Sequence, residues 1–321
     1  MRGCVDQLFN CRIFYFSRID KPQAGPILDS TMKKQLITKR EFLKLGAVGV
    51  FAACTGCNPM AVFSGKKVKC KKRIPVGVQL YSVRKECEKD LTGTIKAVAK
   101  MGYKGVEFAG YYGRDAKTLR KLLDSVGLLC CGTHTGIDTL LDDELPKTIE
   151  FNQTLGNKFL IVPGLQGNYR SSRRAWQETA KLFNELSDKV KPHGMQVGYH
   201  NHSIEFKPLD GELPWDTFFG GTKKEVVMQL DTGNAMGGGG DPVMLLKRYP
   251  GRATTVHLKA FSKSKPNAII GDDELPWQKI FELCETIGGT QWYIVEYESD
   301  AYPPLVSIEK CLETLRRLGK A

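Results

Sequence analysis

The segment Tyr199–Phe206 holds the densest group of residues in this chain that could do acid–base or metal chemistry. It reads Tyr-His-Asn-His-Ser-Ile-Glu-Phe, so it contains two of the five histidines and the carboxylate of Glu205. The residues before it are apolar, as in a buried strand. Unpaired imidazoles and carboxylates are costly to bury, and a group of them at a strand end therefore predicts a metal site or an acid–base pair.

Short apolar strands alternate with helical patterns from Ile74 onward. Eight strands with their helices over about 250 residues is the size of a closed (β/α)8 barrel. No Gly-rich phosphate turn follows the first strand, which argues against an open doubly wound sheet. We therefore expect an α/β protein whose residues 74–321 form a single (β/α)8 TIM barrel, with Gly237–Gly240 as a flexible loop. The expected strands are Val76–Tyr81, Gly105–Phe108, Leu128–His134, Lys158–Val162, Gln196–His202, Val226–Asp231, Thr254–Leu258 and Trp292–Glu296.

Polar residues stand at the ends of these strands, where TIM barrels gather their catalytic groups. Three of them come from consecutive strands, so their side chains should converge: Asp231, His257 and Glu296. Carboxylate and imidazole ligands without a thiolate favour Mn²⁺, Mg²⁺, Fe²⁺ or Zn²⁺. Such an ion would bridge two sugar oxygens and acidify the C–H beside a carbonyl. The other predicted rim residues are Glu107, His134, His200 and His202.

Five short motifs, in this order along the chain, resemble the xylose isomerase-like TIM-barrel proteins, often labelled sugar phosphate isomerases/epimerases. The resemblance covers roughly Ile74 to Gly319. It implies metal ligands in the order Glu, Asp, His and Glu, with the two glutamates moving protons on opposite faces of the substrate. The motifs are Gly105-Val106-Glu107, Tyr199-His200-Asn201-His202, Leu230-Asp231-Thr232-Gly233-Asn234, Val256-His257-Leu258-Lys259 and Ile294-Val295-Glu296.

Asp231, His257 and Glu296 match the last three ligands of that pattern. Lys259 matches a residue that commonly faces substrate oxygens, and we expect it to act in both binding and catalysis. His134 and Asn234 are the further residues that we expect to bind the substrate. Glu296, Glu107, His200 and His202 are the remaining candidate catalytic residues.

The chain departs from the pattern at the first glutamate, where it has His200. Either His200 replaces that ligand, or Glu205 swings in as the fourth metal ligand. The departure puts simple two-glutamate epimerisation in doubt. A histidine base opposite Glu296 suits removal of a proton beside a ketone, followed by loss of a leaving group.

The leading hypothesis is a metal-dependent isomerase or epimerase that acts on a carbohydrate without phosphate, because the sequence shows no phosphate-binding loop. The alternatives are a keto-sugar lyase or dehydratase, of the 3-keto-glycoside or inosose type that the resemblance includes, and a non-catalytic, lipid-anchored sugar-binding protein. An abasic-site endonuclease of the same fold would need a basic face for DNA. Residues 1–73 carry eleven of the twelve net positive charges, so the barrel is close to neutral and we expect no nucleic acid partner.

The N-terminal residues predict export. Thr38–Lys44 resembles a twin-arginine motif with lysine in the first arginine position, and an apolar run and two lipobox-like cysteines, Cys54 and Cys57, follow it. We interpret 1–31 as an extension from a misassigned start codon, 32–57 as a lipoprotein-like signal peptide and 58–73 as a basic tether. The protein would then be periplasmic, or attached to a membrane only through its lipid anchor.

The six cysteines that follow the signal are Cys70, Cys87, Cys130, Cys131, Cys284 and Cys311, and none has the CxxC spacing of a redox or zinc site. Cys130 and Cys131 are adjacent in a predicted strand and therefore point to opposite faces. We expect neither a disulfide framework nor a zinc–thiolate site.

Overall fold

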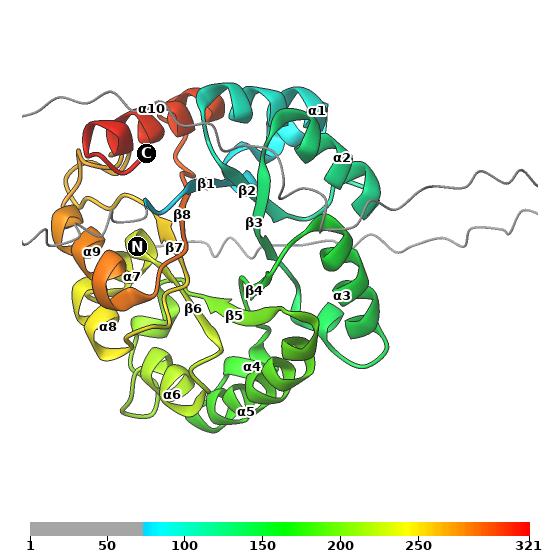
Figure 1. Cartoon of the computed structure of the whole chain (residues 1–321). Helices are drawn as coiled ribbons and strands as arrows, with labels where there is room; N and C mark the ends of the chain where they lie inside the picture. The colour runs from blue at the N-terminus through cyan, green and yellow to red at the C-terminus, as the bar shows by residue number, and fades with distance from the viewer. Residues whose placement is uncertain (1–72) are drawn as a thin grey trace, which may run out of the picture. The chain divides into compact units, whose positions relative to one another are not determined.

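Residues 73–321 are the part of the chain that the computed structural model describes, and they form a closed barrel of eight parallel strands. The strands follow one another around the barrel in chain order, and β8 pairs with β1 to close it. Figure 1 looks along the barrel, with the strands as an inner ring and the helices around them. The predicted (β/α)8 TIM barrel is confirmed.

All eight predicted strands are present, with ends that differ by one or two residues. The one shift that matters for function is at strand five, which ends at His200 and leaves His202 in the following loop. The strands are β1 (Val76–Gln79), β2 (Gly105–Ala109), β3 (Leu129–His134), β4 (Phe159–Val162), β5 (Gln196–His200), β6 (Val227–Asp231), β7 (Thr255–Leu258) and β8 (Trp292–Val295).

Helices connect the strands and cover the outside of the barrel. Five single-turn segments accompany them: η1 (Leu80–Val83), η2 (Ile137–Leu140), η3 (Lys191–His193), η4 (Ile204–Phe206) and the π-type η5 (Cys284–Gly288). The α-helices are α1 (Arg84–Met101), α2 (Ala116–Val126), α3 (Glu144–Leu155), α4 (Gly167–Arg170), α5 (Arg173–Val190), α6 (Pro214–Gly221), α7 (Thr232–Gly238), α8 (Pro242–Arg248), α9 (Trp277–Leu283) and α10 (Pro304–Arg317).

The prediction of a flexible loop over Gly237–Gly240 is wrong at its start, because α7 continues to Gly238. A Cβ atom at Gly238 would lie 2.6 Å from the carbonyl oxygen of Ser203, closer than atoms can approach. The glycines therefore let a short helix pack directly against the backbone of the loop after β5.

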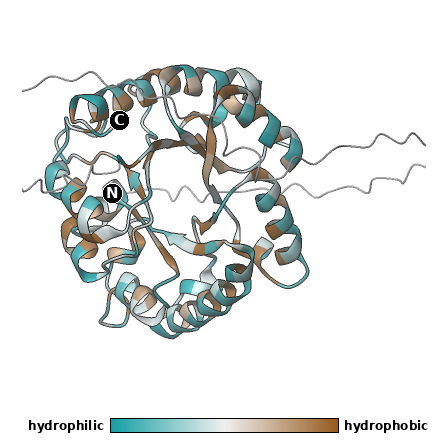
Figure 2. Cartoon of the chain, viewed as in Figure 1, coloured by the Kyte–Doolittle hydropathy of each residue, from teal (hydrophilic) through white to brown (hydrophobic). Residues whose placement is uncertain are grey.

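The apolar residues lie in two layers. The larger layer fills the space between strands and helices, and the helix surfaces that face away from the barrel are mostly hydrophilic (Figure 2). The smaller layer lies on alternate strand residues that point into the barrel, as expected for this fold. Gly105 leaves room there for the Trp292 ring, to which an added Cβ would approach within 3.0 Å. The inner layer consists of Cys131, Phe159, Ile161, Val227, Trp292 and Ile294.

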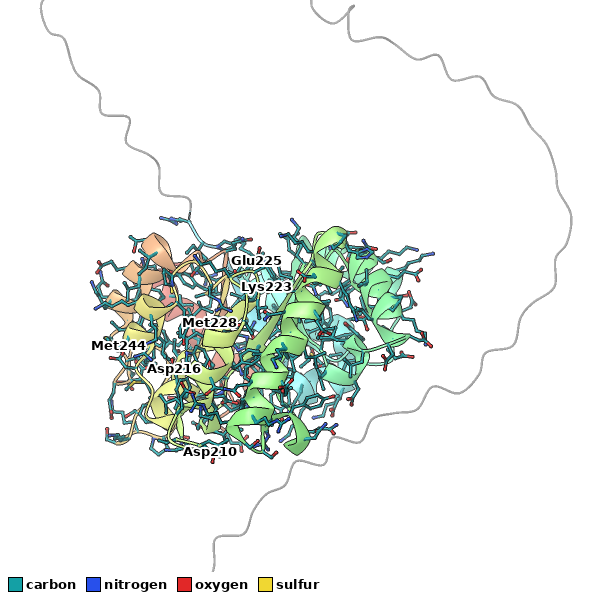
Figure 3. All side chains as sticks on the ribbon, turned by 90° about the horizontal axis from the view of Figure 1, so that it is seen from below. Asp210, Asp216, Lys223, Glu225, Met228 and Met244 are labelled. Atoms are coloured by element: carbon teal, nitrogen blue, oxygen red, sulfur yellow. The ribbon has the colours of Figure 1, made fainter. Side chains whose placement is uncertain are left out.

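The two ends of the barrel are separated in Figure 3. Lys223 and Glu225 precede β6 and lie at one end, and Asp210, in the loop after β5, lies at the other. The strands therefore run towards the end marked by Asp210, and the chemistry predicted at their C-terminal ends belongs to that end.

Other features bear on the predictions from sequence. Cys87, Cys130, Cys131, Cys284 and Cys311 are buried and free, and Cys130 and Cys131 belong to different apolar layers. Among residues 73–321, no helix is both long and apolar enough to cross a bilayer. The predicted leader, signal peptide and almost all of the tether, as well as Cys70, lie outside the described residues.

Candidate active site

Alternate residues of each strand point into the barrel, and near the C-terminal end these inward residues become polar. In β6 the inward series runs from apolar Val227 through Gln229 to Asp231. Because inward residues alternate along a strand, two polar levels follow the apolar layer, two residues apart. In β6, Gln229 belongs to the lower level and Asp231 to the upper level. Among the residues at these levels are Gln79, Glu107, Gln229, Thr255, Asp231 and His257, and all six are 0% exposed.

Four side chains at the upper level could hold one metal ion. His200, Asp231, His257 and Glu296 each offer a ligand atom, and these atoms lie within 4.8 Å of one another. They come from the ends of β5, β6, β7 and β8, which are neighbours in the barrel. The structure thus brings together the three predicted ligands and His200. We call these four residues the rim cluster.

His257 is the centre of the polar contacts. Its Nδ1 atom lies 2.6 Å from Glu296 Oε2, and its Nε2 atom lies 2.6 Å from Glu107 Oε2. Asp231 Oδ2 is 4.0 Å from the same Nδ1. Nδ1 therefore faces the other carboxylates of the rim cluster, while Nε2 faces the level below.

Glu107 is held in that lower level by amide groups. Gln79 donates from Nε2 to Glu107 Oε2 at 2.8 Å, and Gln229 donates from Nε2 to Glu107 Oε1 at 2.8 Å. A Cβ atom on Gly132 would lie 2.3 Å from Glu107 Oε1, so only glycine leaves space for this carboxylate. Glu107 was predicted as catalytic. That role stays a prediction, and the structure shows a completely buried carboxylate in contact with His257 and with two glutamine amides.

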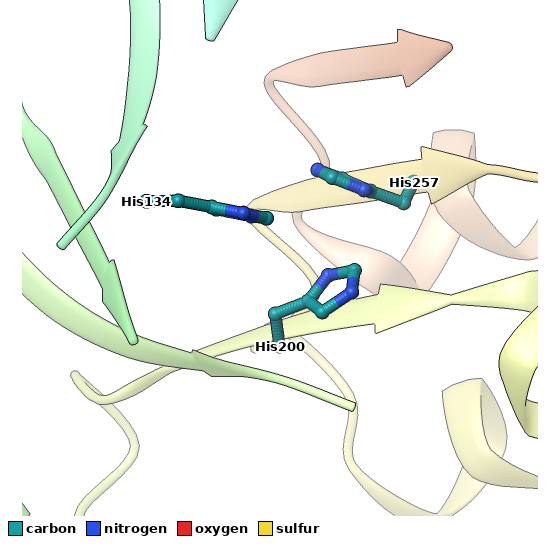
Figure 4. Close-up of side chains that lie close together, drawn as sticks. All are labelled: His134, His200 and His257. Carbon is teal, nitrogen blue, oxygen red and sulfur yellow. The ribbon is translucent and has the colours of Figure 1, made fainter. Parts of the chain in front are cut away.

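Three imidazoles converge from β3, β5 and β7 (Figure 4). The His134 and His257 rings are stacked with centroids 5.3 Å apart, and His200 lies 4.9 Å from His134 and 4.6 Å from His257. Gln229 Oε1 lies 2.9 Å from His134 Nε2 and 3.2 Å from His200 Nδ1. One amide oxygen therefore contacts two of the three rings.

The charges of the cluster are strongly coupled. Burial by itself lowers the pKa of His257, but the Glu107 and Glu296 carboxylates outweigh it and raise this pKa to about 10. Burial raises the pKa of Glu296, but the positive charges of Lys259 and His257 hold it well below its usual value. Without a metal ion, His257 is therefore a protonated imidazole between the Glu107 and Glu296 carboxylates.

Asp231 is the exception among the acids. Burial raises its pKa to about 7, although the charge of Lys259 works in the opposite direction. Its Oδ1 atom accepts the backbone N–H of Asn234, but Oδ2 is buried without a hydrogen-bond partner. A buried carboxylate oxygen that lacks a donor is costly, and a bound cation would remove that cost.

The two remaining imidazoles stay neutral. Burial lowers the pKa of His200 well below its ordinary value, and the neighbouring His257 and His134 lower it further. Burial also lowers the pKa of His134, against the pull of Glu107. Neutral imidazole is the form that ligates a metal or accepts a proton.

Glu205 and His202, predicted as a metal ligand and as a catalytic residue, lie outside the rim cluster. Both oxygens of Glu205 are used locally, since Oε1 accepts the Tyr199 hydroxyl at 2.6 Å and Oε2 accepts the His202 backbone N–H at 2.8 Å. The His202 ring is exposed and contacts His200 at a centroid distance of 5.2 Å. The structure therefore brings His200, and not Glu205, to the fourth position of the cluster.

Asn201 and Asn234 join the ends of β5 and β6. Asn201 accepts the Asp231 N–H at 2.8 Å and donates to the Asp231 carbonyl at 3.2 Å, and Asn234 donates from Nδ2 to the Asn201 carbonyl at 3.2 Å. These bonds fix Asp231 relative to His200. The predicted role of Asn234 in substrate binding stays a prediction, as does that of Lys259, whose ammonium contacts Glu298 beside the cluster.

Sequence reasoning missed the two glutamines of the lower level. Gln79 and Gln229 have no motif of their own, but each is a polar residue at an inward position of an apolar strand. Gln229 lies two residues before Asp231 and therefore on the same face. That period-two relationship was the available signal.

The donor set fits a divalent metal ion on two counts. Imidazole nitrogen and carboxylate oxygen suit Mn²⁺, Fe²⁺ and Zn²⁺, and the unsatisfied Asp231 Oδ2 lies among them. Glu107 contacts Nε2 of His257, the ring nitrogen that faces away from the rim cluster, and this carboxylate–histidine arrangement is one that orients metal-bound histidines.

Fold and site together define a TIM-barrel protein with a buried histidine–carboxylate cluster at the C-terminal ends of its strands. The family model of the xylose isomerase-like TIM barrel matches residues 95–318, and the chain belongs to that family. The relatives indicate an enzyme of this family.

The relatives include dehydratases and isomerases. An inosose dehydratase of Clostridium botulinum is 25% identical over 244 residues, which cover 64% of this chain and 81% of the dehydratase. A rhizopine catabolism protein of Rhizobium meliloti is 24% identical over 265 residues, or 71% of this chain and 81% of that protein. A crystal structure of a sugar phosphate isomerase/epimerase from Parabacteroides distasonis has a TM-score of 0.66 and 25% identity, covering 77% of this chain and 95% of that one.

Proposed function

We propose that this protein is a metal-dependent enzyme that removes the proton beside a carbonyl of an unphosphorylated keto-sugar or cyclic keto-polyol and then eliminates a leaving group. The observation that carries the choice of a lyase or dehydratase is His200 in the rim cluster, where the two-glutamate epimerase pattern has a carboxylate. The similarity to inosose dehydratases supports the same choice.

His200, Asp231, His257 and Glu296 would hold the ion. When bound, a divalent ion polarises the substrate carbonyl and lowers the pKa of the neighbouring C–H. Mn²⁺, Mg²⁺, Fe²⁺ and Zn²⁺ are the candidates, and the two imidazoles make Mg²⁺ the least suitable.

The proton is moved by residues of this chain. His134 is neutral and its side chain is 10% exposed, so it is available as a base, with Glu296 as the carboxylate on the other side of the cluster. Removal of the proton leaves its electron pair as an enolate. Collapse of the enolate then forms a C=C bond conjugated to the ketone and breaks the bond to the β-hydroxyl or glycosidic oxygen. The departing oxygen takes the proton that His134 accepted in the first step, which returns His134 to its neutral form.

Lys259 keeps the site electrically balanced. Burial lowers its pKa, but Glu296 and Asp231 outweigh this and raise it, so Lys259 remains positive. An ammonium in this position would bind an oxygen of the substrate or stabilise the negative enolate oxygen.

The test is incubation of the metal-loaded full chain with an inosose, a 3-keto-glucoside and ketohexoses in D₂O. Deuterium incorporation beside the carbonyl, together with release of water or an aglycone and a new enone absorbance, is the expected result. Glu296→Gln should abolish both signals, and Glu313→Gln, an exposed glutamate of α10, should leave them intact. Absence of both exchange and elimination with every substrate would contradict the proposal.

The second candidate is an epimerase or isomerase, favoured by the similarity to the Parabacteroides isomerase/epimerase. It would show exchange and a second sugar isomer without elimination. A lipid-anchored sugar-binding protein, the third reading of the sequence, would bind a sugar without exchange.

We also propose that the enzyme is exported. The support is the sequence of residues 32–57, with its basic start, apolar run and two lipobox-like cysteines, Cys54 and Cys57. Cell fractionation with labelled palmitate tests this. One of the two variants, Cys54→Ser or Cys57→Ser, should abolish lipid incorporation. A wild-type protein that stays in the cytoplasmic fraction and carries no label would overturn the proposal.

A further inference from the structure

We propose that Gln229 is a positioning residue that sets which ring nitrogen of His134 and of His200 carries the proton, so that His200 presents a lone pair on Nε2 to the rim cluster. The inference rests on the proposed metal site for its purpose. Its direct test is made on the metal-free protein and does not need activity.

A backbone N–H can only donate a hydrogen bond, and one such group fixes the orientation of the Gln79 amide. The backbone N–H of Tyr81 donates to Gln79 Oε1 at 3.0 Å, and this orients the Gln79 amide so that Nε2 points to Glu107 Oε2. A carboxylate only accepts hydrogen bonds. The lower level therefore has a fixed acceptor at its centre.

The orientation of Gln229 follows from that acceptor. Its amide nitrogen must face Glu107 Oε1, 2.8 Å away, because an amide oxygen there would oppose a carboxylate oxygen. Gln229 Nε2 also lies 3.0 Å from Thr255 Oγ1. The amide oxygen is thus left facing the two histidines.

An amide oxygen accepts and cannot donate, so both ring nitrogens that face it must carry hydrogen. These are His134 Nε2, at 2.9 Å, and His200 Nδ1, at 3.2 Å. His134 Nε2 is also 3.3 Å from Glu107 Oε2, a second acceptor. A neutral imidazole carries one proton, so His200 keeps its lone pair on Nε2 and His134 keeps its own on Nδ1.

The two lone pairs have different uses. His200 belongs to the rim cluster, where a lone pair on Nε2 is what a ligand needs. His134 is outside that cluster of four, and a free Nδ1 suits the proton-accepting role proposed for it. One buried amide thereby assigns a ligand role and a base role to two neighbouring imidazoles.

The experiment is long-range ¹H–¹⁵N correlation NMR on the full chain with ¹⁵N-labelled histidine, first without metal and then with Zn²⁺. The five histidines of the chain give few signals, and His193 and His202 serve as exposed references. We expect the Nδ1–H form for His200 and the Nε2–H form for His134. An Nε2–H form for His200 in the wild type would overturn the proposal, even if no variant folds.

Gln229→Met keeps the length of the side chain and removes the oxygen. We expect a mixture of tautomers at His200 and His134 and Zn²⁺ binding that is weaker by roughly 10–100-fold, the usual effect of losing a residue that orients a ligand. The matched control is Met228→Leu, because Met228 directly precedes Gln229 in β6 and belongs to the larger apolar layer between strands and helices. It should change neither tautomers nor affinity.

Unchanged tautomers in a folded Gln229→Met protein would overturn the proposal. Failure of the proposed function is a separate outcome. The expected tautomers, with neither exchange nor elimination on any keto-sugar, would contradict the proposed reaction and leave the role of Gln229 unaffected.

Discussion

His257 Nε2 lies 2.6 Å from Glu107 Oε2, across 150 positions of sequence. The contact spans the barrel interior from β7 to β2 and is completely buried. Because a carboxylate only accepts hydrogen bonds, the contact keeps a proton on His257 Nε2. Removal of the proton on Nδ1 then leaves a lone pair on Nδ1 that faces Asp231 and Glu296. Glu107 thus acts on the rim cluster through His257.

Glu107→Gln should weaken metal binding by roughly 10–100-fold while the protein stays folded, because an amide can accept from fewer donors than a carboxylate in the same space. Isothermal titration with Zn²⁺ measures the change. The matched control is Glu205→Gln, a second buried glutamate, bonded to Tyr199 and His202 instead of the cluster. Equal losses in both variants would contradict a specific role for Glu107 in metal binding.

Gly132→Ala should destabilise the protein by about 1–3 kcal/mol, since the new methyl group would overlap the Glu107 carboxylate. Urea unfolding of the metal-free protein measures this free energy. Gly136→Ala is the control, because a Cβ atom there meets nothing within 4 Å and the backbone φ of −63° suits alanine. A Gly132→Ala protein with the same free energy of unfolding as the wild type would contradict the packing described.

Metal binding should release protons, and more of them at lower pH. His257, with its pKa raised to about 10, is protonated at pH 8 and must lose one proton to ligate, so about one proton per ion is expected there. Asp231, with a pKa raised to about 7, is mostly protonated at pH 6 and adds a second. Titration calorimetry in buffers of different ionisation enthalpy counts these protons. Binding without release at pH 8 would exclude His257 as a ligand.

The same raised pKa makes the metal-free protein sensitive to pH. A histidine whose pKa is raised on folding stabilises the folded state fully below its unfolded pKa, near 6.5, and the contribution is lost as the pH rises towards 10. The Tm difference between wild type and His257→Gln, followed from pH 6 to 10, should therefore shrink. A difference that grows over this range would contradict the assignment.

Lys259→Met should weaken Zn²⁺ binding and shift its pH dependence upward, because Lys259 lowers the pKa of both Asp231 and Glu296. Without that charge both acids hold their protons to higher pH and compete with the ion. Lys279→Met is the control, since Lys279 forms an exposed ion pair with Glu282. Zn²⁺ binding curves from pH 5 to 8 measure the shift. A curve that does not shift in Lys259→Met would contradict an effect of Lys259 on the pKa of Asp231 and Glu296.

The fold and most of the rim cluster were predictable from local patterns. Eight apolar runs separated by helical periods led to the barrel, and the position of Asp231, His257 and Glu296 at the ends of successive runs led to the cluster. Both rest on periodicity and chain order, which a sequence contains. The same reasoning left His200 and Glu205 open, because either residue, five positions apart, could reach the site from one loop.

Tertiary structure decided that choice and the roles below the rim. Strand five ends at His200, and a tight 3₁₀ turn after it directs Glu205 back to Tyr199 and the His202 backbone. Gln79 and Glu107 are partners on the neighbouring strands β1 and β2, whereas Gln229 of β6 meets Glu107, 122 positions away, only because the barrel closes around one interior. The sequence by itself therefore determined the barrel and the residue types at its rim. The tertiary structure decided which atoms face one another, because hydrogen-bond direction depends on distances that no local pattern encodes.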